Sequence, residues 1–199
     1  MTPRFSVIVA TSGRPTLARA LQSLADQPLA PPDAVLLTAG DEVLVVGAGA
    51  AIHDVADTFG YRFLEAGPFG DWGQRERQAA MAHATGTHLV FLDDDDVFLP
   101  GAFAAMRLAC AAHPDRPLMF KMITIGGSTI WTDPAVRCGN HGGPQFVTPN
   151  DPAKLGTWGL RYEGDFDFCV STLAHYPPGA LVWNETVTYE CRPKTEAVA

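Results

Sequence analysis

The chain has 199 residues, of which 47% are hydrophobic and 18% are charged, and its formal net charge is −8. This composition is typical of a folded globular protein and excludes a disordered chain. The acidic balance disfavours nonspecific binding to nucleic acid or anionic membranes, because phosphate groups are bound by clustered Lys and Arg.

Targeting signals and disulfide patterns are not evident. No apolar run reaches the roughly 18 residues that a membrane-spanning helix needs, and the N-terminal run Phe5–Val9 is followed by a turn, unlike a signal peptide. The four cysteines are widely spaced and form no C-x-x-C motif, which favours reduced thiols. We therefore expect a cytoplasmic protein with no transmembrane segment.

The first half of the chain alternates strand and helix patterns. Runs of β-branched and apolar residues predict strands over 5–10, 41–46, 61–64 and 87–92. Helical periodicity predicts helices over 16–25, 50–59 and 75–84. This alternation predicts an α/β fold with a mostly parallel central sheet and helices on both faces.

Glycines and prolines punctuate these elements. Pro28, Pro31 and Pro32 form a breaker after the first helix, and residues 67–73 are predicted to be a loop. Gly60 closes the second helix, and the turn at Gly86 is predicted to cap the third helix in a left-handed conformation.

The second half has a different sequence pattern, with short predicted strands and Gly-rich turns, which predicts a smaller antiparallel part. Strands over 118–125 and 129–132 are joined by a Gly-Gly-Ser turn and read as a hairpin. Residues 139–152 are too long and irregular for a simple turn and are interpreted as a functional loop. An acidic cluster and a short helix follow over 162–175, and a last strand is predicted over 180–189.

Four consecutive aspartates, Asp93–Asp96, directly follow the fourth predicted strand. Adjacent carboxylates repel one another, and a cation relieves that repulsion. Mg²⁺ or Mn²⁺ takes oxygen ligands and commonly shares its coordination with substrate phosphates. We interpret the cluster as a metal site for a phosphorylated substrate, although a solvated acidic turn is the simpler alternative.

Three polar or small-residue segments are predicted to meet at one edge of the sheet. They are Thr11–Arg14, Gly47–Gly49 and Asp93–Asp96, which follow the first, second and fourth strands. Ligands of parallel α/β sheets bind beyond the carboxyl ends of the strands, so this edge is the predicted binding site.

The segment Gly47-Ala48-Gly49, with Glu65 after the next strand, has the spacing of a dinucleotide-binding fingerprint. However, Ile52 occupies the position where close packing of helix on strand requires a small residue. We interpret the segment as a small-residue turn and keep an NAD- or FAD-dependent oxidoreductase as a less favoured alternative.

Two ordered blocks resemble the GT-A fold glycosyltransferases of family 2. The first is Phe5–Pro15 with the helix end Leu21–Leu24, and the second is Arg77–Asp96, where a helix and an Ala-Thr-Gly turn lead to a D-x-D motif. The resemblance covers residues 4–105 and extends weakly to about residue 170. The sequence departs from the family at Gly47–Gly49, which replace a usual Asp, and at Gln78, which replaces a usual Asn.

The resemblance implies an inverting, metal-dependent transfer of a sugar from a nucleotide-diphosphate sugar to an acceptor hydroxyl, with Mn²⁺ or Mg²⁺ as cofactor. Asp93 and Asp95 would bind the metal. Nucleotide-binding positions would be Thr11, Arg14, Arg77, Asp93 and Asp94. Arg75 is interpreted as a surface charge. The chain is expected to be a single domain, 1–199, with a nucleotide-binding half over 1–100 and an acceptor-side half over 101–199.

Inverting transfer also needs a general base for the acceptor hydroxyl. The acidic cluster before the predicted helix offers Asp165 first, Glu163 second and Asp167 third. The same carboxylates could instead cap the helix N-terminus.

Other side chains of the second half are less specific. Residues 142–150 and Trp158 could shape the acceptor site, and His141 and His175 are each interpreted as structural rather than as a further metal ligand. The acceptor class (glycan, lipid or small molecule) stays open, and a noncatalytic nucleotide-sugar binding protein is the main alternative to an enzyme.

Overall fold

The computed structural model describes residues 2–27 and 40–193. The predicted breaker at Pro28, Pro31 and Pro32 lies outside these residues. Within the described ranges, no helix combines the length and the apolar character that crossing a membrane requires.

The helices are α1 Leu17–Ala25, α2 Ala50–Thr58, α3 Gln74–Met81, α4 Ala102–Ala112, α5 Gly164–Leu173 and the short 3-10 helix η1 Gly143–Gln145. The strands of the first half are β1 Phe5–Ala10, β2 Glu42–Gly47, β3 Arg62–Glu65, β4 His88–Asp93 and β5 Val97–Phe98. Those of the second half are β6 Leu118–Ile123, β7 Thr129–Ile130, β8 Phe146–Pro149 and β9 Val182–Glu190.

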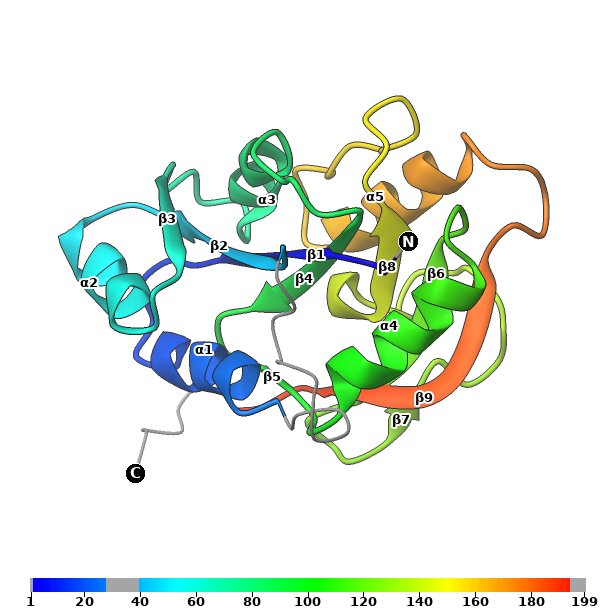
Figure 1. Ribbon diagram of the computed structural model, residues 1–199, viewed down its shortest axis with the longest axis horizontal. Helices are drawn as coiled ribbons and strands as arrows, with labels where there is room; N and C mark the ends of the chain where they lie inside the picture. The colour runs from blue at the N-terminus through cyan, green and yellow to red at the C-terminus, as the bar shows by residue number, and fades with distance from the viewer. Residues whose placement is uncertain (1, 28–39, 194–199) are drawn as a thin grey trace.

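One mixed sheet joins the strands in the order β3-β2-β1-β4-β8-β6-β9-β5, with β7 pairing to β6 (Figure 1). Strands β3, β2, β1 and β4 are parallel. The antiparallel strand β8 then connects β4 to β6. The predicted fold class, a mostly parallel sheet with a smaller antiparallel part in the C-terminal half, is confirmed.

Strand β1 is a largely apolar run whose side chains pack into two separate buried clusters, one on each face of the sheet. Because side chains alternate along a strand, Phe5, Val7 and Val9 join one buried cluster with residues of α1 and α4, whereas Ile8 and Ala10 join a second cluster with residues of α3 and α5. Helices therefore cover both faces of the sheet (Figure 1).

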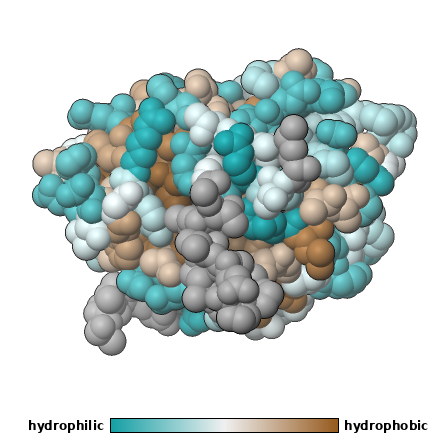
Figure 2. Space-filling model, in the orientation of Figure 1, coloured by the Kyte–Doolittle hydropathy of each residue, from teal (hydrophilic) through white to brown (hydrophobic). Residues whose placement is uncertain are grey.

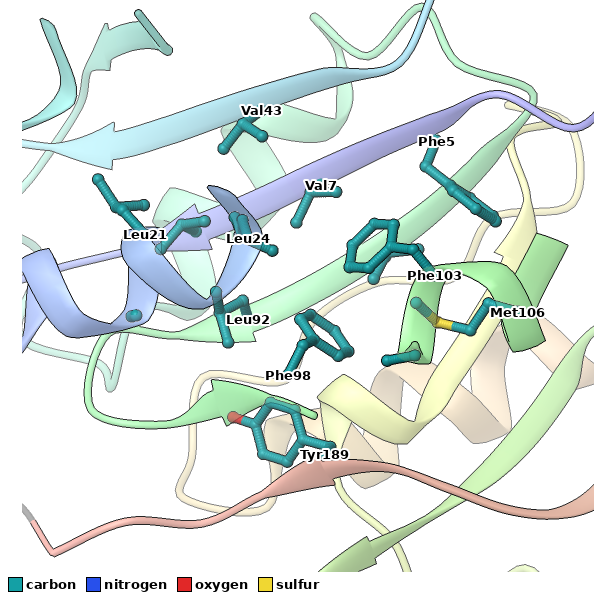
Figure 3. Packing of buried hydrophobic residues seen from close by; sticks show 14 of the residues in the cluster. Phe5, Val7, Leu21, Leu24, Val43, Leu92, Phe98, Phe103, Met106 and Tyr189 are labelled. Carbon is teal, nitrogen blue, oxygen red and sulfur yellow. The ribbon is translucent and has the colours of Figure 1, made fainter. Parts of the chain in front are cut away.

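The first cluster is rich in aromatic side chains (Figure 3). Phe98 lies edge-to-face against both Phe103 and Tyr189, with ring centroids 5.2 and 5.4 Å apart. On the outside, hydrophilic and weakly polar residues cover most of the face in Figure 2, with hydrophobic residues confined to patches between them. In the interior, burial of the apolar rings is the main driving force for the packing of Phe98 with Phe103 and Tyr189.

The second half contains the largest differences from prediction. Residues 139–152 are not a loop throughout: they include η1 and the buried strand β8, which bridges the two parts of the sheet. Strand β5 and helix α4 had no counterpart in the prediction. The expected hairpin is present as β6 and β7, where Met122 pairs with Ile130.

Gly86 corrects another expectation. It does not cap α3, which ends at Met81, and its φ is not in the left-handed region. A Cβ at Gly86 would lie 2.6 Å from the carbonyl carbon of Phe5 and from the backbone nitrogen of Ser6. Glycine is required here because the turn before β4 packs directly on the backbone of β1.

Candidate functional site

A cleft of about 760 Å³ opens beyond the carboxyl ends of β1 and β4. β1 pairs with β2 on one side and with β4 on the other, so the chain order reverses at β1. Such a switch point leaves a crevice above the strand ends, where ligands of α/β sheets bind. The cleft lining combines the aspartate cluster, the loop after β1, the loop before α3 and the beginning of α5.

Asp94 ties the aspartate cluster to the loop after β1. Its side chain accepts hydrogen bonds from the Thr11 hydroxyl at 2.6 Å and from the Ser12 backbone N–H at 3.3 Å. Arg14 reaches the other oxygen of Asp94 at 2.7 Å and also an oxygen of Asp95 at 3.1 Å. Both oxygens of Asp94 therefore have protein partners, and this residue orders the loop that carries Thr11 and Arg14.

Asp93 forms an ion pair with Arg77 of α3. The Arg77 guanidinium also donates to the Trp72 carbonyl oxygen at 2.9 Å and lies over the Trp158 ring, 5.0 Å from its centroid. Arg77 is buried, but the Asp93 side chain is 36% exposed. Asp93 consequently presents a carboxylate to the cleft from a position that Arg77 fixes.

Asp96 is held from the C-terminal side of the chain, a role that the sequence did not indicate. It accepts hydrogen bonds from the Tyr189 hydroxyl and from the Arg192 backbone N–H, each at 2.7 Å. Burial, reinforced by the negative charge of Asp93, raises the pKa of Asp96 to about 7. The ring of Tyr189 belongs to the aromatic cluster of Figure 3, so the hydrophobic core positions this carboxyl group.

Asp165 lies in the first turn of α5 and lines the same cleft. Burial raises its pKa, and the nearby Asp93 acts in the same direction, while Arg77 and the hydrogen bond from the Phe166 backbone N–H oppose the rise. A carboxylate with a raised pKa holds a proton more strongly, which suits a general base.

The other two candidate bases have different surroundings. Asp167 is engaged by Arg161 through two hydrogen bonds of 2.8 and 2.7 Å, and this pairing lowers its pKa. Glu163 lines the cleft and lies 3.7 Å from Arg161. Burial and the neighbouring Asp93 thus raise the pKa of Asp165, whereas the pairing with Arg161 lowers that of Asp167.

The two histidines also differ. His175 is exposed at the end of the α5 region, whereas His141 is buried in the cleft lining, 5% exposed, and stacks on Phe166. Neither ring nitrogen of His141 has a hydrogen-bond partner, and burial lowers its pKa to about 4.

The predicted metal ligands fit a cation that also binds substrate. Asp93 and Asp95 both line the cleft, and carboxylate oxygens suit Mg²⁺ or Mn²⁺. Within residues 2–27 and 40–193, no three His, Cys, Asp or Glu side chains gather as a complete metal cluster. A cation held by one or two carboxylates completes its coordination with phosphate oxygens and water, so this donor set matches a substrate-assisted site.

The glycine segment after β2 packs as a tight turn. A Cβ at Gly47 would lie 2.6 Å from the Thr11 carbonyl oxygen, and Gly49 precedes α2 with a φ of 111°. Gln78, at the second departure from the family pattern, accepts a hydrogen bond from the Trp158 backbone N–H at 3.0 Å. Both departures therefore have packing roles.

Arg75 and Trp158 have contacts that do not require a ligand. Arg75 is half exposed and pairs with Asp71 at 2.9 Å, in line with its interpretation as a surface charge. Trp158 is buried and stacks on Phe168, with centroids 4.8 Å apart. Trp72 and Tyr162 are cleft-lining aromatics that the sequence analysis did not single out.

Residues 6–116 match the family described as Glycosyl transferase family 2. No curated protein matches the chain. The matched range contains β1 except for Phe5, the strands β2–β4, the aspartate cluster and α4.

Solved structures share the fold at low sequence identity. S. aureus TarS 1–349 superimposes with a TM-score of 0.72 and 18% identity, over 95% of this chain and 60% of that chain. The same protein in complex with UDP-GlcNAc gives a TM-score of 0.70 and 16% identity, over 98% and 62%. Glucosyl-3-phosphoglycerate synthase from Mycobacterium tuberculosis, in complex with Mn2+, UDP and glucosyl-3-phosphoglycerate, gives 0.66 and 15%, over 96% and 72%. The chain thus spans about 60% of the length of TarS 1–349.

Proposed function

Because the chain belongs to glycosyl transferase family 2, we propose that its cleft transfers a sugar from a nucleotide-diphosphate sugar to an acceptor hydroxyl with inversion at the anomeric carbon. The observation that carries this proposal is the presence of Asp93, Asp95 and Asp165 in one cleft at the sheet's switch point. In this proposal the single domain 1–199 binds the nucleotide mainly through residues 1–100 and shapes the acceptor side mainly through 101–199.

The donor side is formed by the loop after β1 and by the aspartates. Thr11 and Arg14 line the nucleotide pocket, and Asp94 holds them in place through the hydrogen bonds described above. Arg77 balances the charge of Asp93 and orients that carboxylate. Structures of TarS with UDP and UDP-GlcNAc support a uridine nucleotide as the first donor to test.

Asp93 and Asp95 would hold Mn²⁺ or Mg²⁺, and the Mn2+ present in the glucosyl-3-phosphoglycerate synthase complex supports this assignment. The bound ion would neutralise negative charge on the donor's diphosphate as it leaves.

Asp165 acts as the base. It removes the proton of the acceptor hydroxyl as that oxygen attacks the anomeric carbon, and the bond from that carbon to the diphosphate breaks with its electron pair leaving on the phosphate oxygen. Burial and the charge of Asp93 raise the pKa of Asp165, which increases its basicity. Glu163 is the second candidate because it also lines the cleft.

The proposal is tested by thermal unfolding of the chain with UDP, UDP-GlcNAc and ADP, each with and without Mn²⁺. A nucleotide present at about 100 times its Kd stabilises the folded state by roughly 2.7 kcal/mol, or about 5–10 °C in midpoint for a chain of this size. We expect this shift with a uridine nucleotide and Mn²⁺ together, and its loss in Asp95→Ala.

Asp167→Asn is the matched control, because Asp167 is an acidic residue near the cleft whose carboxylate is engaged by Arg161. It should retain the metal-dependent shift. Nucleotide binding that needs no divalent ion and persists in Asp95→Ala would contradict the metal assignment. Metal-dependent binding without transfer or donor hydrolysis would instead favour the noncatalytic alternative.

A further inference from the structure

Two strongly exposed aromatic side chains lie at the mouth of the cleft. Trp72 is 59% exposed and Tyr162 is 71% exposed, and both line the cleft. Their rings meet edge-to-face with centroids 6.2 Å apart and an interplanar angle of 81°. Large aromatic side chains normally gain stability by burial, so their exposure beside a cleft needs an explanation other than packing.

The backbone of Trp72 is strained. Its φ is 58°, and it is the one residue other than glycine with a positive φ in the described part of the chain. A bulky side chain is unfavourable in this conformation, and such strain persists where the surroundings fix it, commonly at functional sites. Here the surroundings include Arg77, which donates a hydrogen bond to the Trp72 carbonyl oxygen at 2.9 Å.

The two aromatic residues come from separate segments that are joined to each other. Gln74, at the beginning of α3, donates from its side chain to the Arg161 carbonyl oxygen at 3.2 Å. A Cβ at Gly164 would lie 2.6 Å from the same Gln74 side-chain nitrogen, so the segments are in direct contact. The aromatic corner, which we define as Trp72 and Tyr162, is therefore presented by two connected parts of the fold.

The corner and the proposed base line the same cleft. Tyr162 lies just before α5, three residues before Asp165 in the first turn of that helix. The Trp72 carbonyl oxygen accepts a hydrogen bond from Arg77, whose guanidinium also pairs with Asp93. An acceptor hydroxyl must come within hydrogen-bond reach of its base, and the remainder of an acceptor in this cleft can contact the rings that also line it.

The charges around the corner restrict the class of acceptor. Glu163 and Asp71 line this part of the cleft and are paired with Arg161 and Arg75. The cleft lining as a whole nevertheless has eight Asp and Glu side chains and only three Arg side chains. A phosphorylated or otherwise anionic acceptor would meet net repulsion here. An uncharged sugar ring carries C–H groups on its faces, which can lie on an aromatic surface, and hydroxyls on its edges.

We propose that Trp72 and Tyr162 form the acceptor subsite and bind an uncharged pyranose whose hydroxyl is delivered to Asp165. This inference rests on the proposed function for the role of Asp165, and it names the acceptor class of that reaction. It also means that the acceptor side draws on both halves of the chain, because Trp72 precedes α3 whereas Tyr162 precedes α5.

The test is saturation-transfer NMR on the full chain with UDP and Mg²⁺ present, because the paramagnetic Mn²⁺ would broaden the signals of a nearby probe. The probes are the methyl glycosides of glucose, galactose, mannose and N-acetylglucosamine. We expect saturation of the ring C–H protons of at least one probe, with affinity reduced roughly tenfold in Trp72→Ala and in Tyr162→Ala. Leu160→Ala is the matched control, because Leu160 is 58% exposed nearby but does not line the cleft.

Folding and donor binding are measured on the same variants. Trp72→Gly should unfold at the same temperature as the unsubstituted chain or higher, because glycine accepts a positive φ, and it should still lose the pyranoside. The affinity for UDP with Mn²⁺ should be unchanged in every variant. If the chain binds a pyranoside but does not bind UDP, the proposed function is contradicted and the aromatic subsite is still supported.

Three outcomes overturn the inference. The first is the absence of binding by any of the four pyranosides to a chain that binds UDP. The second is a fall in UDP affinity in Trp72→Ala with pyranoside binding intact, which would assign the corner to the nucleobase. The third is Trp72-dependent binding to neutral phosphatidylcholine vesicles without pyranoside binding, which would make the corner a lipid contact.

Discussion

The two sides of the cleft are built differently. On the side proposed to bind the donor, which we call the donor side, Asp93 and Asp94 are paired with Arg77 and Arg14, so the strand ends are fixed before any ligand binds. On the acceptor side, Asp165 has a raised pKa and the aromatic corner is open to solvent. Such an arrangement suits a site that recognises one constant diphosphate group and leaves acceptor recognition to less constrained side chains.

Asp94 and Asp165 also differ in role, because Asp94 orders neighbouring residues whereas Asp165 is the proposed base. Asp94 is buried within a set of protein hydrogen bonds and organises its neighbours. Asp165 is partly buried and accepts a hydrogen bond from the Phe166 backbone N–H at 2.7 Å, and it lines the cleft with a raised pKa. Substitutions on the two sides should therefore change different measured quantities.

The largest effect is expected from Asp165→Asn, which keeps the shape of the side chain but removes the proposed base. General-base catalysis contributes roughly 10²- to 10⁴-fold, so kcat for sugar transfer should fall by about that factor, while UDP affinity with Mn²⁺ is retained. The measurement is transfer or donor hydrolysis at saturating nucleotide sugar. Full activity in this variant, with activity lost in Glu163→Gln, would move the base to Glu163.

Two arginine variants distinguish stability from donor binding. Arg107 pairs with the fully buried Asp41 at the amino end of the strands, so Arg107→Met should lower the free energy of unfolding by about 3–5 kcal/mol. Arg77→Met should cost less, about 2 kcal/mol, because Asp93 is 36% exposed and solvent screens its charge.

The loss of UDP affinity should rank the two variants in the opposite order to the loss of stability. Arg77→Met removes the partner of Asp93 and should weaken metal-dependent UDP binding, whereas Arg107→Met should leave it unchanged at a temperature where the variant is folded. Calorimetric titration and urea unfolding of both variants make the comparison. Equal loss of UDP affinity in the two variants would show that Arg77 acts only through stability.

The donor side could be predicted from the sequence because its residues follow buried strands. Strand ends of a parallel sheet meet at one edge, and the pairing of Ala10 with both Val46 and Asp93 places the three predicted segments there. The resemblance to family 2 is likewise confirmed by the family match. The catalytic and ligand-binding roles of individual residues stay predictions.

The acceptor side was less predictable for physical reasons. Strand β8 follows a Gly- and Pro-rich segment, and only its pairing to β4 and β6 makes it a strand. Asp165 and Asp167 lie about 200° apart around a helix, so at most one could face the cleft, but the partner Arg161 that engages Asp167 was not evident from spacing. The positive φ of Trp72 has no counterpart in its sequence pattern.

A pH-dependent loss of stability should report the burial of His141. Its pKa is about 4 in the folded state and about 6.5 when unfolded, so between these values the unfolded chain binds more protons. The stability contribution is therefore complete above about pH 6.5 and is lost as pH falls, by up to about 3 kcal/mol near pH 4.

His141→Phe should remove this part of the pH dependence and keep the stacking on Phe166. Asp96 and Asp165 have raised pKa values and contribute in the opposite direction, so the informative quantity is the difference between variant and unsubstituted chain. Urea unfolding at pH 7, 6, 5 and 4.5 provides it. Parallel stability curves would mean that His141 is not protonated on unfolding.

The smallest effect is expected at the hydrogen bond that joins the donor loop to the aspartates. Thr11→Val keeps the size of the side chain but removes the hydroxyl that donates to Asp94 at 2.6 Å. Asp94 retains Arg14 and the Ser12 N–H, so the free energy of unfolding should fall by about 1.5 kcal/mol. Thr11→Ser keeps the donor and should lose less than half of that amount. If Thr11→Ser is the more destabilised of the two variants, the methyl group contributes more than the hydroxyl of Thr11 to the stability of this loop, and packing holds the loop more than its charged network does.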